Sequence, residues 1–233
     1  MKTRIISAAI LAIGLMALGL FIKGGIDDYA NKDRQVSVKG LAEREVAADK
    51  VTWPIVSKEQ GNNLLELYDR IAVKQQKIKQ FLIKSGIQPN EISINPPKVV
   101  DVKAEQYSSN EREYRYYATL VITVTSHKVD LVRSIIAGQG ELLKQGIAIV
   151  ADDNEDFIDY DYVSFKAMKP RMMQEAIANA ETTAQQFAKN RHSKLNKIVS
   201  ADQGQFSIED RDINTPYIKK VRVVTTVTYS LKD

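Results

Sequence analysis

The stretch VSVKGLAEREVAADKVTWPI, residues 36–55, decides the class of fold. Apolar and polar residues alternate at a period of two over 36–40, and the alternation resumes over 51–55. This period is typical of a strand with one buried face. Residues 47–50, between the two parts, predict a bend or a bulge. The folded part of the chain is therefore expected to open with two extended segments.

Further along the chain, the apolar spacing changes to steps of three and four, which predicts helices. Asn62 and Asn63 offer a cap for a first long helix, and Ser85-Gly86 ends it. Its predicted buried stripe is Leu64, Leu65, Tyr68, Ile71, Ala72, Ile78 and Leu82. The second long helix has Pro170 in its first turn. Its stripe is Met173, Ala176, Ile177, Ala180, Ala184, Phe187 and Ala188, and the alanines predict close packing. A shorter helix is expected over 129–143, ended by Gly146.

The remaining apolar segments predict strands, mostly in pairs. They fall at 92–94, 99–102, 114–124, 147–150, 157–165, 194–206 and 217–231. Strand pairs imply hairpins and therefore antiparallel sheets. We expect an α+β fold of mostly antiparallel sheets, packed by the two long helices and the shorter one. The order of elements also hints at two related halves, one around each long helix.

The N-terminal segment predicts the compartment. Lys2 and Arg4 precede an uncharged run, IISAAILAIGLMALGLFI at 5–22, which is near the lower length limit for a membrane helix. No small-x-small cleavage site follows, so residues 1–23 are interpreted as a signal-anchor, with a cleaved signal peptide as the alternative. The flanking charges place the N-terminus inside, which predicts a single-pass bacterial inner-membrane protein with a periplasmic domain. A linker at 24–34 and a folded domain at 35–233 complete the expected organisation.

Composition excludes several classes of protein. The chain has 233 residues, 44% of them hydrophobic and 27% charged, which is typical of a globular protein. It has no cysteine, which excludes a disulfide scaffold, a thiolate nucleophile, a cysteine zinc site and an iron–sulfur cluster. The net charge of +4 is small and dispersed. A nucleic-acid partner is therefore not expected.

No motif predicts a catalytic, cofactor-binding or metal-binding residue. His127 and His192 lie far apart, and we interpret each as a polar surface residue. Gly138-Gln139-Gly140 falls inside a predicted helix, so it is no nucleotide-binding loop. An acidic run at 152–156 partly fits a calcium loop, but Phe157 takes the glycine position. A solvated turn is the favoured interpretation, and weak Ca²⁺ binding is the alternative.

Two side-chain groups suggest binding. Lysines follow one face of the first long helix, at positions 74, 77, 79 and 84. They form either an anion-binding face or, more simply, a solvated one. A second group surrounds Arg112 and Arg115 with tyrosines at 107, 114, 116 and 117. It resembles a stacking platform, although alternating tyrosines also form ordinary cross-strand pairs.

Several of these segments together resemble the SIMPL-domain family, which includes periplasmic immunogenic proteins. The resemblance begins with VSVKGLAE at 36–43 and VAADKV at 46–51, continues at Gly86 and EISI at 91–94, and returns in the alanine-rich helix and the closing strand. Ala48 stands where the family usually has proline, and Asn190-Arg191-His192 replace a more usual Leu-Gly. Family membership implies an exported or anchored α+β protein that self-associates and has a loose link to envelope stress.

Three functions follow from these observations. The first is a non-enzymatic, membrane-tethered envelope protein that self-assembles as a homo-oligomer through its helices and sheet edges. The second is an envelope module that binds an unidentified glycan, peptide or anion around residues 107–117. The third is an unrecognised hydrolase whose site is assembled from scattered side chains.

Overall fold

A computed structural model describes residues 2–31, 34–104, 113–150 and 157–232, without the side chains of residues 2–10 and 27–31. The described helices are α1 (Lys2–Asn31), α2 (Leu64–Lys84), α3 (Val129–Ala137), α4 (Gly140–Lys144) and α5 (Phe165–Asn190). The described strands are β1 (Gln35–Ala47), β2 (Lys50–Gly61), β3 (Ile92–Ile94), β4 (Lys98–Asp101), β5 (Tyr116–Ser126), β6 (Asp159–Asp161), β7 (Lys194–Asp210) and β8 (Ile218–Lys232). Helices and antiparallel strands confirm the α+β class.

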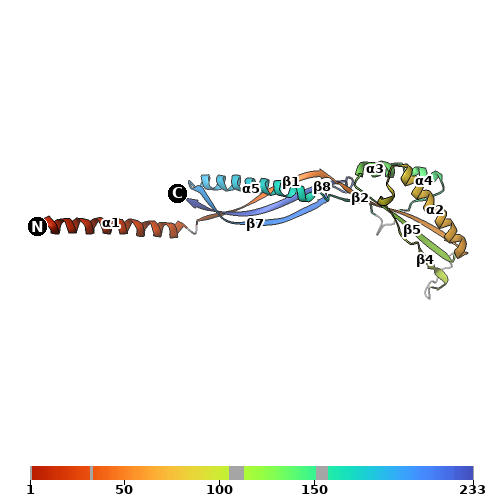
Figure 1. Ribbon diagram of the computed structural model, residues 1–233, viewed down its shortest axis with the longest axis horizontal. Coiled ribbons are helices and arrows are strands. Elements are labelled where there is room, and N and C mark those ends of the chain that lie inside the picture. The colour runs from red at the N-terminus through yellow and green to blue at the C-terminus, as the bar shows by residue number, and fades with distance from the viewer. Residues whose placement is uncertain (1, 32–33, 105–112, 151–156, 233) are drawn as a thin grey trace. The chain divides into compact units, whose positions relative to one another are not determined.

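The chain divides into two compact units, each containing one of the two long helices that follow β1. Unit 1 comprises residues 1–44, 167–207 and 221–233, and unit 2 comprises residues 45–166 and 208–220. Figure 1 shows α5 beside the strands of unit 1, and α2 beside β5 and β4 in unit 2. The units differ in what fills their interiors.

Unit 2 is built on a five-stranded antiparallel sheet. The order is β3-β5-β2-β6, and β4 also pairs with β5. The longest ladder joins β2 to β5, from Val51 opposite Ser126 to Gly61 opposite Tyr116. Large apolar side chains from α2, α3 and α4 pack on this sheet together with those of its strands. The fully buried ones include Ile55, Leu67, Ile78, Leu82, Leu120, Ile122 and Leu142.

Helix α2 begins and ends as the sequence predicts. The side chain of Asn63 accepts a hydrogen bond from the backbone N–H of Leu65 at 3.0 Å, and Gly86 has a φ of +99°. The predicted buried stripe is only partly right, since Leu64, Leu65, Tyr68 and Ala72 are exposed. Leu67, which the prediction omitted, is fully buried beside Ile71. The buried row of α2 is Leu67, Ile71, Ile78 and Leu82, which the packing against the sheet selects among several apolar positions.

Unit 1 places α5 on a three-stranded sheet of order β1-β8-β7. Ala176, Ala180 and Ala184 are fully buried, at 0% exposure, which confirms the close packing that the alanines predict. Gly40 on β1 makes that approach possible. A Cβ at this position would lie 1.8 Å from the carbonyl oxygen of Ala176, so only glycine fits without a shift of the backbone.

The two opening strands are expected as a strand pair, but they do not pair with each other. The predicted bend does occur, at Ala48-Asp49. It sends β1 to the sheet with β8, whereas β2 joins the sheet with β5 and β6. Local alternation predicts that a strand forms but not which strand it pairs with, since pairing is decided by the packing of distant elements.

Three local predictions are wrong in ways that have physical causes. The shorter helix is broken at Gly138 into α3 and α4, because glycine favours helix poorly. Residues 147–150 form no strand, although the N–H of Val150 donates to the carbonyl of Val56 at 2.9 Å and Ile147 is buried in the core of unit 2. Helix α5 starts at Phe165, so Pro170 lies inside the helix and the segment 157–165 contributes only the short β6.

Helix α1 extends through Asn31, across most of the expected linker at 24–34. Where its side chains are described, over residues 11–26, they are exposed within this chain. Among the residues whose side chains are described, no helix is both long enough and apolar enough to cross a membrane. The predicted anchor at 5–22 includes residues 5–10, whose side chains lie outside those described, so the anchor stays a prediction.

Candidate functional site

The bend at Asp49 gathers segments that are far apart in the sequence. The backbone N–H of Ala48 donates to the carbonyl of Tyr217 at 2.8 Å, and that of Asp49 donates to the carbonyl of Asp161 at 2.9 Å. His127 donates from Nδ1 to the carbonyl of Asp49, also at 2.8 Å. All of these residues belong to unit 2, so the bend is a structural junction within that unit.

The carboxylate of Asp49 fixes the turn that leads into α5. It accepts hydrogen bonds from the backbone N–H of Val163 at 2.6 Å and of Ser164 at 2.9 Å. Burial raises the pKa of Asp49, but hydrogen bonds from Ser164 and Val163 outweigh burial and hold that pKa below its usual range. The ionised carboxylate is therefore the form that the fold uses.

An aromatic cluster lies beside this bend. The rings of Tyr160 and Tyr217 meet edge to face with centroids 6.1 Å apart, and the guanidinium of Arg133 lies 3.4 Å from the centroid of the Tyr217 ring. Burial raises the pKa of the Tyr160 hydroxyl, which keeps it neutral. The Arg133–Tyr217 contact joins α3 to the turn before β8, and no short-range pattern in the sequence signals it.

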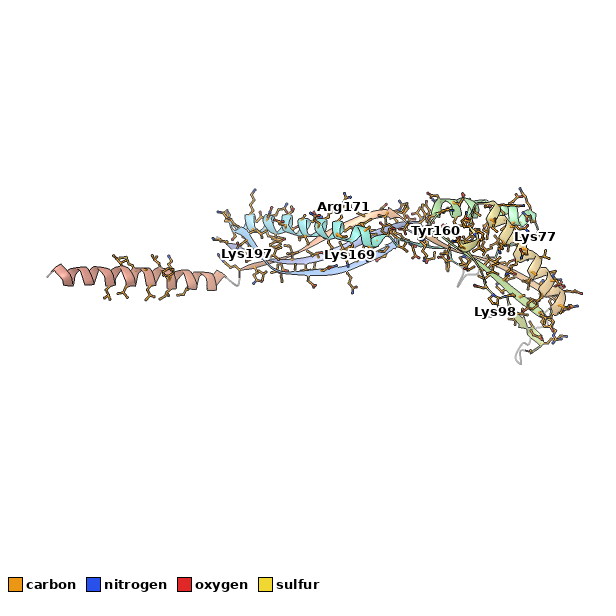
Figure 2. The ribbon with its side chains drawn as sticks, in the orientation of Figure 1. Lys77, Lys98, Tyr160, Lys169, Arg171 and Lys197 are labelled. Atoms are coloured by element: carbon orange, nitrogen blue, oxygen red, sulfur yellow. The ribbon has the colours of Figure 1, made fainter. Side chains whose placement is uncertain are left out.

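A cavity of about 340 Å³ adjoins α2 in unit 2. Arg70, Lys74 and Lys77 of the helix line it together with Glu59 of β2 and the segment 145–147. Figure 2 shows Lys77 on unit 2. Three cationic side chains of one helix thus line one cavity together with two acidic side chains, those of Glu59 and Asp69.

The structure separates the four lysines of α2 by their surroundings. The side chain of Lys74 is 12% exposed, and its ammonium forms an ion pair with Glu59 and donates to Ser57 Oγ at 3.1 Å. Lys77 and Lys84 are exposed, and Lys79 is half-buried. The simple interpretation of a uniformly solvated face is therefore wrong for Lys74. Its sequence spacing is indistinguishable from that of its neighbours, because burial here depends on β2.

Where the tyrosine group is described, its rings are half-buried, at Tyr114, Tyr116 and Tyr117. Tyr107 and Arg112 lie outside the described residues, whereas Tyr116 packs against the core of unit 2. Arg115 is bound by both carboxylate oxygens of Asp101, at 2.8–3.2 Å, and lies 4.9 Å from the centroid of the Tyr116 ring. The lining of the cavity beside α2 includes none of these side chains.

The remaining candidates have structural contacts or fall outside the described residues. His127 and His192 are exposed, as expected of polar surface residues. The acidic run at 152–156 lies outside the described residues, and the nearby Asp161 forms an ion pair with Lys50 at 3.1 Å. The described part of the chain contains no group of three or more His, Asp or Glu side chains placed to hold a metal.

The described carboxyl groups with a shifted pKa all shift downwards. A hydrogen bond from Ser126 lowers the pKa of Glu91, and one from Arg115 lowers that of Asp101. Hydrogen bonds from Thr215 and Arg211 lower the pKa of Asp212 to about 2. A general acid at neutral pH needs a raised pKa, so these shifts indicate structural hydrogen bonding.

Strand β7 presents the most exposed part of the unit 1 sheet. It is an edge strand in the order β1-β8-β7, and it extends over 17 residues. Most of its residues are exposed, including Ile198 at 53% and Val199 at 51%. An edge strand has a row of backbone N–H and C=O groups that can pair with another strand.

The fold and these surfaces define a two-unit α+β protein with an exposed sheet edge. The sequence profile of SIMPL, described as a protein of unknown function (DUF541), matches residues 36–229. The chain therefore belongs to the SIMPL family. A comparison with curated proteins gave no match.

Proposed function

We propose that this SIMPL protein is a non-enzymatic scaffold, tethered to the membrane and working outside the cytoplasm as a homo-oligomer. The observation that carries the proposal is the edge strand β7, because it is long, exposed and partly apolar. Natural proteins usually protect such edges with short strands, charges or bulges. Pairing with a second copy would satisfy the exposed backbone groups and bury Ile198 and Val199.

The tether rests on the run of apolar residues at 5–22 and its flanking charges. A reporter fused after Asp33 tests the topology directly. It should report from the outer side of the membrane, and alkaline carbonate should leave the protein in the membrane pellet. A reporter that stays inside would contradict the compartment, whatever the assembly state.

Assembly is tested on the full chain in detergent by size-exclusion chromatography with light scattering. Ile198→Lys and Val199→Lys should reduce the oligomer by placing charges on the edge. Ile213→Lys is the matched control, since Ile213 is 91% exposed and lies in the turn after β7. The self-assembly proposal fails if the wild-type chain is a monomer at high concentration, or if the control dissociates the oligomer equally.

A second candidate function is an envelope module that binds an anion, which the cavity beside α2 favours. Arg70, Lys74 and Lys77 give this cavity three positive charges against Glu59 and Asp69. An acidic ligand could replace water at Lys77 while Glu59 holds Lys74. Titration with a small dicarboxylate, followed by NMR, should shift the signals of Lys77 in the wild type and leave Lys77→Gln unresponsive.

A further inference from the structure

A second cavity, of about 460 Å³, lies in unit 1 where three elements end or begin. Its lining includes Arg34 and Val36 at the start of β1, Phe187 and Arg191 at the end of α5, and Leu231 at the end of β8. The backbone N–H of Leu231 donates to the carbonyl of Arg34 at 2.9 Å, which joins the two strand ends. The cavity therefore belongs to the folded body of unit 1.

Positive charge is concentrated on this end of unit 1. The run FAKNRHSKLNK at 187–197 contains four Lys or Arg residues and no Asp or Glu. Figure 2 shows one of them, Lys197, at the end of unit 1 where Figure 1 places the C-terminus. One of the four, Arg191, lines the cavity, and Arg34 adds a second guanidinium group to the lining. Guanidinium groups suit phosphate because their paired N–H donors match two phosphate oxygens.

The turn between the lining residues Arg191 and Ser193 is strained. His192, at its centre, has a φ of +58°, in the left-handed region that a non-glycine residue enters at a cost. The N–H of Ser193 donates to the carbonyl of Ala188 at 2.9 Å, so the turn closes the helix as a glycine would. Strained backbone of this kind often accompanies a binding site.

Besides the two arginines, the lining contains the polar residues Gln35 and Ser193 and three apolar residues. Phe187 is 55% exposed, and Val36 and Leu231 are half-buried. An exposed phenylalanine beside two arginines suits a ligand that combines a phosphate with a hydrocarbon group. Inorganic phosphate alone would leave the apolar walls in water.

We propose that this cavity binds the phosphate ester of an anionic phospholipid. Arg34 and Arg191 hold the phosphate oxygens, and Phe187 and Leu231 contact the adjoining glycerol and acyl carbons. Arg34 follows the end of α1 by three residues, so a membrane anchor would bring the cavity towards the lipid headgroups. The membrane source of the ligand rests on the proposed function, whereas the phosphate chemistry rests on the cavity.

The test uses the full chain carrying Phe187→Trp, since the one natural tryptophan, Trp53, is only 3% exposed and lies in unit 2. In nanodiscs that contain phosphatidic acid with brominated acyl chains, the new tryptophan should be quenched. Quenching should be much weaker in discs in which phosphatidylcholine is the only lipid and carries the brominated acyl chains. Titration with soluble dihexanoyl phosphatidic acid then measures the affinity in the same variant.

Arg191→Gln should weaken this affinity about tenfold, which is typical for the loss of a charge-assisted hydrogen bond. Arg171→Gln is the matched control, because Arg171 is exposed on the same helix and lies 20 residues from Arg191 (Figure 2). Arg34→Gln provides a second variant at the cavity, and circular dichroism verifies that each variant folds.

Three outcomes would overturn the proposal. The first is that dihexanoyl phosphatidic acid does not bind, and the second is that Arg171→Gln loses as much affinity as Arg191→Gln. The third is that glycerol 3-phosphate binds as tightly as dihexanoyl phosphatidic acid, which would assign the site to a soluble phosphate ester. The titration does not depend on membrane topology. A failure of the lipid-binding proposal can therefore be distinguished from a failure of the proposed compartment, which the reporter fused after Asp33 tests.

Discussion

The two units of this protein are stabilised by opposite features of their interiors. In unit 2, a five-stranded sheet and three helices enclose large side chains such as Leu67, Ile78 and Leu82. In unit 1, a buried cluster of Val38, Ala180, Ala184, Val227 and Tyr229 lies between one helix and three strands. The stability of unit 2 depends on large buried side chains, whereas that of unit 1 depends on small residues where α5 contacts β1.

Leu82→Ala should have the largest effect. Leu82 is fully buried, so its truncation leaves a cavity and should lower the free energy of unfolding by about 3–4 kcal/mol. Urea denaturation followed by Trp53 fluorescence measures the loss in unit 2. Ile213→Ala, at a position 91% exposed, should change stability by less than about 0.5 kcal/mol. Equal effects at both positions would contradict the role of volume in unit 2.

Gly40→Ala tests the opposite rule in unit 1. The added methyl group would clash with the carbonyl oxygen of Ala176. The backbone would have to shift to relieve this clash, which should lower the free energy of unfolding by about 2–3 kcal/mol. Hydrogen exchange should show the loss in the amides of α5 and β8. Gly140→Ala is the control, since a Cβ there has no atom within 4 Å. A neutral Gly40→Ala would remove the contrast between the units.

Asp49→Ala should cost about 1–2 kcal/mol, because two backbone N–H groups lose their acceptor. The pKa of Asp49 lies below its usual value, so the carboxylate stabilises the fold above the pKa of the unfolded chain. That contribution is lost as the pH falls through the lower pKa of the folded state.

Denaturation at several pH values checks this sign. The difference in the free energy of unfolding between the wild type and Asp49→Asn should be largest at neutral pH and should become smaller in acid. Asp159→Asn, at an exposed carboxyl of β6, is the control. A difference that is unchanged or grows as the pH falls would show that the ionised carboxylate does not stabilise this turn.

The sequence predicts local features of the fold better than long-range ones. Asn63, Gly86 and the alanines of α5 have local signals, and the structure confirms them. The pairing of β1 with β8 has no local signal, since the partners are almost 200 residues apart and the bend at Asp49 separates β1 from β2. The break at Gly138 is not visible in the spacing of apolar residues, which continues from α3 into α4.

The candidate sites show the same limit. Lys77 and the cationic run at 187–197 can be found in the sequence, but the two cavities cannot, because each combines residues from segments far apart in the chain. Asp49 belongs to a motif that resembles the family, yet its partners Val163 and Ser164 carry no pattern that would identify them. The sequence therefore identifies charged segments and leaves their geometry to the fold.

His192→Gly should have the smallest effect, and it should be stabilising. Helix α5 ends at Asn190, and His192 then adopts a φ of +58°, which glycine adopts without a Cβ clash. The change should raise the free energy of unfolding by about 0.5–1 kcal/mol, as relief of left-handed strain does elsewhere. Thermal unfolding measures the gain, with exposed Lys189→Gly as a control that should destabilise the helix. If His192→Gly is neutral or destabilising, the side chain of His192 makes a compensating contact at the cavity end of unit 1, and the turn is no longer evidence of stored strain beside Arg191.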